Sequence, residues 1–199
     1  MLNWIEALVH KLGATGVFLL MLLENVFPPI PSELVLPLAG YLAAKGDSSL
    51  ALMVLAGTAG SVAGATIWYW IGRLVGIERL ARIAERHGRW LTLTPSEVRH
   101  AAEWFDRHGR WTVLVGRMIP GVRSLISVPA GMARMPLPPF LILTSVGSLA
   151  WSAGLAVAGY KLGKSYDLVA QVIGPTSNIL LAAVIVWYIY RVLTFKRVR

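Results

Sequence analysis

The sequence predicts an all-α polytopic membrane protein with two inverted-topology repeats, each a re-entrant helical hairpin followed by a transmembrane helix. Three observations support this prediction. Hydrophobic residues make up 56% of the 199 residues, which is more apolar surface than one soluble core of this size can bury. Three uncharged stretches are long enough to cross a bilayer as helices, namely residues 48–72, 135–160 and 168–190. Two other apolar stretches are broken by prolines.

The first half, residues 13–76, combines a hairpin at about 14–44 with the span 48–72. The hairpin breaks at Pro28, Pro29 and Pro31, because prolines this close together cannot lie inside a continuous helix. Each arm is about a dozen residues long, which is too short to cross the hydrocarbon core. The chain is therefore expected to turn back within the membrane. In an alternative topology, residues 8–27 cross the membrane once before a shorter loop.

The connection at residues 77–110 is polar and is expected to form two amphipathic helices on the membrane surface. Gly88 is expected to end the first helix. The segment from Thr94 to Glu97 is a capping-box pattern with proline at the first helical position, so it predicts the start of the second helix. Gly109 is expected to end that helix.

The second half, residues 111–163, repeats the order of hairpin and span. Its hairpin, residues 111–134, is broken at Pro120 and carries two arginines, and the span 135–160 follows. A hairpin with one span crosses the membrane an odd number of times, so the two halves must have opposite topology, as in transporters with inverted repeats. The last uncharged stretch, 168–190, is expected to add a C-terminal transmembrane helix.

An internal alignment supports this duplication. With an offset of 87 residues, residues 58–76 overlay 145–163 without gaps. Glycines recur in packed membrane helices in any case, but the shared order of hairpin and span favours a common origin. The matched pairs are Gly60 with Gly147, Ser61 with Ser148, Ala63 with Ala150, Gly72 with Gly159 and Gly76 with Gly163.

Positive charge, a formal +9 overall, is concentrated in residues 73–110 and at the C-terminus. Basic residues next to spans are typical of the cytoplasmic face, so both segments are expected to be cytoplasmic. No stacking platform accompanies the charge, which disfavours nucleic-acid binding. Cysteine is absent and the histidines fit surface positions, so neither a metal nor a cofactor is predicted. The sequence is compatible with a monomer or a homo-oligomer.

Four charges lie where the bilayer interior is expected: Glu24 and Glu33 in the first hairpin, and Arg117 and Arg123 in the second. An unpaired charge costs roughly 2.5–3.5 kcal/mol at the centre of an inserted helix, so we expect these charges to pair or to be hydrated. Arginine suits bidentate contact with phosphate, and a buried carboxyl can exchange a proton. We therefore predict that the arginines bind a lipid phosphate and that the glutamates couple protons. The alternative is a static clasp that only holds the hairpins together.

Two motifs resemble the signatures of the DedA family, also described as SNARE-associated or VTT-domain proteins. The first runs from Glu24 through Pro-Pro-Ile-Pro-Ser at 28–32 to Glu33, and the second is Gly-Arg-Met-Ile-Pro-Gly-Val-Arg at 116–123. Together with the segments that follow them, the motifs cover roughly residues 13–163. In some members Asp occupies the position of Glu33, so the side chain here is longer but keeps its charge.

The resemblance implies a multi-pass protein of the bacterial cytoplasmic (inner) membrane with two opposed re-entrant hairpins. It further implies movement of undecaprenyl phosphate, or in some branches of phospholipids such as phosphatidylethanolamine, across the bilayer. The family's functional acids and arginines match Glu24, Glu33, Arg117 and Arg123 of this sequence. We therefore expect a proton-coupled flippase for an anionic lipid, with membrane lipids and protons as its partners.

Four alternatives stay open from the sequence. The first is a phospholipid flippase or scramblase, and the second is a proton-coupled transporter of an ion or a small solute. The third is a membrane assembly factor without transport, in which the charges form only the clasp. The fourth, an enzyme acting on lipid phosphate, is not expected because no nucleophile–base arrangement lies near the broken segments.

Overall fold

The fold is known from a computed structural model, which describes residues 2–26, 32–91, 94–119, 122–162, 190, 192 and 194. Eight α-helices and no strands occur in this part of the chain, in agreement with the predicted all-α class. Two of the described helical stretches, Leu50–Ile83 and Leu137–Leu162, are long and apolar enough to cross a membrane. The predicted C-terminal span at 168–190 falls almost wholly outside the described residues. Pro28, Pro29, Pro31 and Pro120, the predicted hairpin breaks, also lie outside them.

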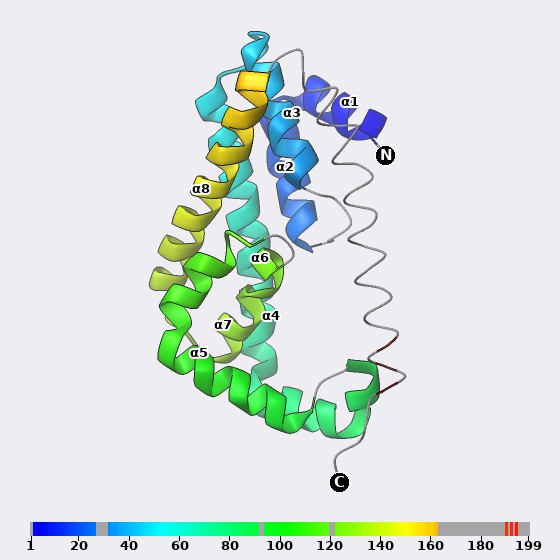
Figure 1. Cartoon of the computed structure of the whole chain (residues 1–199), viewed down its shortest axis with the longest axis vertical. Helices are drawn as coiled ribbons and strands as arrows, with labels where there is room; N and C mark the ends of the chain where they lie inside the picture. Colours follow the sequence, from blue (N-terminus) through cyan, green and yellow to red (C-terminus); the bar gives the residue numbers. More distant parts are fainter. Residues whose placement is uncertain are drawn as a thin grey trace.

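The N-terminal helices α1 (Leu2–Leu12), α2 (Ala14–Val26) and α3 (Ser32–Ala44) gather at one end of the molecule, the top of Figure 1. α2 and α3 are short and almost wholly apolar, so both bury most of their surface against the rest of the bundle. Leu20 and Leu36, for example, lie in one core cluster with Met53 of the next helix. α2 ends and α3 begins near mid-height of the molecule (Figure 1). The polar and charged residues at these two helix ends therefore meet residues from the second half of the chain.

Helix α4 (Leu50–Leu91) runs the length of the molecule and joins the predicted span to the first predicted surface helix. Its backbone is left-handed at Gly76, with φ +67°, a conformation that glycine adopts at little cost. The prediction that Gly88 ends a helix is wrong, because the helix continues to Leu91. A glycine within a helix costs only about 1 kcal/mol relative to alanine, too little to end a helix that its neighbours support.

Helix α5 (Pro95–Gly116) begins as predicted, with a complete capping box. The Glu97 backbone N–H donates to Thr94 Oγ1 at 3.2 Å, and the Thr94 backbone N–H donates to Glu97 Oε2 at 2.8 Å. The prediction that Gly109 ends this helix is wrong. The Phe105 ring lies over Gly109, and the helix continues to Gly116. Residues 111–116, predicted as the first arm of a hairpin, are therefore continuous with the second predicted surface helix, and Val113 among them is buried in the core.

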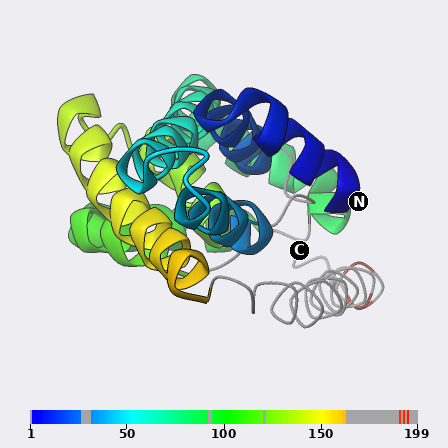
Figure 2. The ribbon, with the colours of Figure 1, turned by 90° about the horizontal axis from the view of Figure 1, so that it is seen from above.

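Two short helices, α6 (Val122–Leu125) and α7 (Ser127–Met132), follow and lead to the apolar α8 (Leu137–Leu162). α3 packs along α8, and α7 packs along α4 (Figures 1 and 2).

Each of these two interfaces brings backbones together at a pair of glycines. A side-chain carbon at Gly40 or Gly159 would collide with the carbonyl oxygens of Ala156 and Pro37, respectively. At the other interface, Gly131 and Gly72 face the carbonyl oxygens of Tyr69 and Val128 in the same way. Gly72 and Gly159 are one of the pairs that the internal alignment matches, so the two interfaces use corresponding positions of the two halves.

Candidate functional site

The predicted charged residues converge at mid-height of the bundle. Glu24 lies near the end of α2, Glu33 in the first turn of α3, Arg117 at the C-terminal cap of α5 and Arg123 in α6. Arg117 and Arg123 are 1% and 4% exposed, and Glu24 is 7% exposed, whereas Glu33 is only half-buried. Both guanidinium groups are thus enclosed by protein.

Glu24 and Arg123 form an ion pair between the two halves of the chain. Arg123 Nη2 donates to Glu24 Oε2 at 2.8 Å, within the range of a strong charge-assisted hydrogen bond. The same nitrogen lies 3.3 Å from Ser61 Oγ of α4. The sequence predicts that acids of the first half meet arginines of the second, and the structure shows this contact for Glu24 and Arg123.

Ser32, at the start of α3, connects three functional groups. Its hydroxyl accepts hydrogen bonds from Arg123 Nη1 at 3.3 Å and from Trp151 Nε1 of α8 at 3.4 Å. It also lies 3.4 Å from Glu33 Oε2, to which it can donate. The Trp151 ring faces the guanidinium of Arg123 at 5.9 Å, which adds a weak cation–π contact. Glu33 therefore joins the cluster through Ser32 rather than by a direct ion pair.

Arg117 is the most buried charge among the described residues, and its hydrogen-bond partners there are neutral. Its Nη2 donates to Ser127 Oγ at 2.5 Å, and its Nη1 lies 3.5 Å from Asn25 Oδ1. Its Nε has no hydrogen-bond partner among the described residues. Gly147 of α8 makes room for this side chain, since a carbon there would come within 2.7 Å of Arg117 Cβ.

Asn25 holds this part of the site together. Its side-chain amide donates to the Met21 carbonyl at 3.1 Å and to Glu24 Oε2 at 3.3 Å. The backbone carbonyl of Asn25 accepts a hydrogen bond from Trp68 Nε1 of α4 at 2.7 Å. The amide therefore fixes the carboxylate of Glu24 while its oxygen faces Arg117.

Sequence reasoning found the four charges but assigned no role to the polar residues around them, which are Asn25, Ser32, Ser61 and Ser127. Two of these carried a usable signal. Asn25 directly follows Glu24 in an otherwise apolar helix, and Ser61 is one of the residues that the internal alignment matches. Ser127 had no signal beyond being polar in an apolar stretch, because only the fold brings it to Arg117.

The buried part of the site holds more arginine than carboxylate. Two guanidinium groups and one carboxylate, that of Glu24, are buried, whereas the second acid of the site, Glu33, is half-buried. Arg117 in particular has only neutral hydrogen-bond partners among the described residues. A buried charge without a counter-ion is destabilising, so Arg117 is suited to an anion. Among the described residues, no three His, Cys, Asp or Glu side chains gather as metal ligands would.

Comparison with known proteins decides the family. The model of the VTT domain matches residues 30–161, most of the chain and most of the described helices. The chain belongs to the VTT-domain family, also called the DedA family. It is therefore a membrane protein, as the sequence predicts.

Several VTT-domain relatives match nearly the whole chain. An "Alkaline phosphatase-like protein" of Lactococcus lactis subsp. cremoris is 40% identical over 96% of this chain and 90% of its own length. The "Undecaprenyl phosphate transporter A" of Staphylococcus aureus is 34% identical over 94% of this chain and 92% of its own. The protein of the same name from Bacillus subtilis is 32% identical over 98% and 96%. No solved structure matches the chain.

Proposed function

We propose that this VTT-domain protein is a flippase that moves a phosphate-bearing lipid, most simply undecaprenyl phosphate, across the cytoplasmic membrane in exchange with protons. The observation that carries this proposal is the guanidinium of Arg117 at mid-height of the bundle, which is 1% exposed and bonded to neutral groups. The names of these relatives refer to phosphate chemistry, and two of the relatives are named undecaprenyl phosphate transporters. A planar guanidinium offers phosphate two parallel hydrogen bonds.

The transport step we propose is an exchange of partners at Arg123. In the closed state Arg123 is bound to Glu24, and an arriving phosphate takes its place on the guanidinium. A buried carboxylate that has lost its arginine is costly as an anion, so Glu24 then takes up a proton. When the phosphate leaves, Glu24 releases the proton and binds Arg123 again. Glu33, linked through Ser32, is the second acid in this exchange.

For the membrane topology, we propose two inverted repeats, residues 13–76 and 111–163, each a re-entrant hairpin (about 14–44 and 111–134) with one span. Residues 77–110 and the C-terminus lie on the cytoplasmic side. A further span at 168–190 crosses the membrane before the C-terminus. Two features support this arrangement. α2 and α3 reach mid-height from one end of the molecule, and α6 and α7 lie on the other side of that level (Figure 1). The glycine pairs at the α3–α8 and α4–α7 interfaces relate the halves as a two-fold axis would.

A phosphatase that cannot cross membranes tests the proposal directly. Purified protein is reconstituted into vesicles that hold a polyprenyl phosphate in both leaflets, and the enzyme is added outside. Vesicles with the wild-type chain should lose the whole pool of phosphate, because inward-facing headgroups are carried out and cleaved. Vesicles without protein should lose about half of it. If wild-type vesicles also stop at half, under imposed pH gradients of either sign, the chain is not a lipid phosphate transporter.

A further inference from the structure

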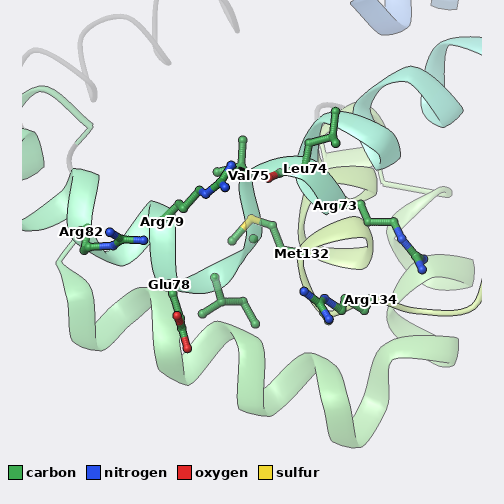
Figure 3. A pocket seen from close by; sticks show the side chains of 11 residues that line it. Arg73, Leu74, Val75, Glu78, Arg79, Arg82, Met132 and Arg134 are labelled. Carbon is green, nitrogen blue, oxygen red and sulfur yellow. Dashed lines mark hydrogen bonds between the residues drawn. The ribbon is translucent and has the colours of Figure 1, made fainter.

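A second cationic site lies at the end of the molecule opposite to α1. Four arginines, Arg73, Arg79, Arg82 and Arg134, line a pocket of about 650 Å³ between α4 and the turn that follows α7. One acid, Glu78, is on its rim. Figure 3 shows Arg79 and Arg82 on one side, Arg73 and Arg134 on the other, and Met132 between them. None of these residues belongs to the Glu24–Arg123 centre.

Two unusual backbone positions create this pocket. Gly76, at φ +67°, redirects α4, and a side-chain carbon there would meet nothing within 4 Å. Arg134, at φ 53°, is the one residue other than glycine with positive φ among those the structure describes. This conformation is unfavourable for arginine, and strained residues of this kind gather at functional sites. The chain thus has an arginine in the pocket at a backbone position where glycine would give a more stable fold.

Two of the arginines are held by neutral groups of α4. Arg73 Nη1 donates to the hydroxyl of Tyr69 at 2.6 Å and lies over the Trp70 ring. Arg79 Nη1 donates to the Leu74 carbonyl at 3.3 Å. Like charges around one hollow focus the electrostatic field, which raises the local concentration of anions. The volume is within the range of small-ligand sites, which is ample for a phosphate headgroup.

The surroundings identify the ligand as a lipid rather than free phosphate. Immediately before the pocket, α4 exposes apolar side chains, with Leu74 72%, Trp70 46% and Ile71 39% exposed. In a membrane protein such a face meets acyl chains, so the pocket lies where the hydrocarbon ends and headgroups begin. A phosphate bound there would have its acyl chain beside α4.

The pocket is close to the buried centre along the chain. Ser127, at the start of α7, accepts a hydrogen bond from Arg117, and Met132, at the end of α7, lines the pocket. Five residues of helix rise only about 7.5 Å. The ends of α7 therefore contact the two arginine sites.

We propose that this pocket binds the phosphate headgroup of a lipid at the membrane surface and is a binding site separate from the Glu24–Arg123 centre. Its role as the loading step of transport rests on the proposed function, whereas the binding itself does not. An arginine near the membrane surface, such as Arg134, is ordinarily an interfacial anchor. The pocket gives this arginine a ligand instead.

Lipid binding to the purified full-length chain tests the pocket without transport. Native mass spectrometry would measure the dissociation constants of phosphatidic acid and phosphatidylcholine. We compare a pocket double variant, Arg79→Gln with Arg134→Gln, with a control of equal charge, Arg99→Gln with Arg107→Gln, on the exposed face of α5. The pocket variant should weaken phosphatidic acid binding at least about tenfold, and the control less than about twofold. Equal weakening by both would overturn the proposal, because it would indicate diffuse surface charge.

Three further measurements separate the alternatives. Arg134→Gly removes the strain, so it should fold at least as well as wild type and still bind phosphatidic acid more weakly; unchanged binding would contradict the proposal. Inorganic phosphate at equal concentration should not displace the lipid, and full displacement would indicate a site for free phosphate. Glu78→Gln, which removes the acid that lines the pocket, should strengthen phosphatidic acid binding, whereas weaker binding would contradict the proposal. Wild-type binding through the pocket without movement of lipid would refute the proposed function and leave the docking site intact.

Discussion

The carboxylate of Glu24 and the guanidinium of Arg123 lie 2.8 Å apart, although 99 residues separate them in the chain. The pair joins the end of α2 to α6, so each half of the sequence supplies one charge. Removing one partner of a buried ion pair typically costs about 3–5 kcal/mol, which is a large part of the free energy of unfolding of a typical domain. The pair therefore ties the two halves of the chain together at the level of the site.

Exchanging the two charges separates a static clasp from a transport site. The double variant Glu24→Arg with Arg123→Glu should fold, because the ion pair can form in reverse, but it should lose transport because the fixed access to a phosphate is reversed. Thermal unfolding and the phosphatase assay measure the two properties. The single variant Arg123→Gln is the control and should be less stable than the exchange, since it leaves Glu24 unpaired. Transport at the wild-type rate in the exchange variant would establish the clasp.

Lysine variants test whether the arginines bind phosphate through their planar fork. Arg117→Lys and Arg123→Lys keep the charge but remove the bidentate geometry, so each should insert and fold yet transport about tenfold to a hundredfold more slowly. Rates in the phosphatase assay give the ratio, and gel filtration in detergent shows whether the variants are folded. Wild-type rates in both lysine variants would rule out this role for the arginines.

Residue chemistry alone revealed much of this fold and some of the site. The capping box at Thr94 and the long apolar spans could be recognised because local sequence determines them. The prediction that Gly109 ends a helix is wrong because the packing around this glycine, where the Phe105 ring covers it, cannot be read from local sequence. The bonds from Arg117 to Asn25 and Ser127 depend on tertiary packing, which no local pattern encodes.

The glutamates should differ in their effect on the pH dependence of transport. Glu24 is buried and paired, and Glu33 is half-buried, so Glu24 is the stronger candidate for the proton that is exchanged. Glu24→Gln should flatten the pH profile of transport between about pH 5 and 8, because glutamine cannot exchange a proton. Glu33→Gln, measured in the same vesicles, should retain part of the dependence. An unchanged profile for Glu24→Gln would remove that residue from the coupling.

Glycines on one helix provide a matched test of the packing between the halves. Gly159 of α8 has no room for a side chain because the Pro37 carbonyl lies against it, whereas nothing lies within 4 Å of a side-chain carbon at Gly154. Gly159→Leu should separate α3 from α8 and lower stability by about 1–3 kcal/mol or more, and Gly154→Leu should be tolerated. Thermal unfolding in detergent compares the variants. Equal stability of the two leucine variants would mean that α3 and α8 are not in close contact.

Single cysteines can determine how the first hairpin lies in the membrane, because the chain has no cysteine of its own. Lys11 at the end of α1 and Ser49 before α4 are exposed near one end of the molecule, and Ser96 is exposed at the start of α5 near the other (Figure 1). If α2 and α3 form a re-entrant hairpin, Lys11→Cys and Ser49→Cys should both react with an impermeant maleimide outside intact cells, and Ser96→Cys only after lysis. If residues 8–27 cross the membrane instead, Lys11→Cys and Ser49→Cys will react from opposite sides, and the inverted repeat is lost.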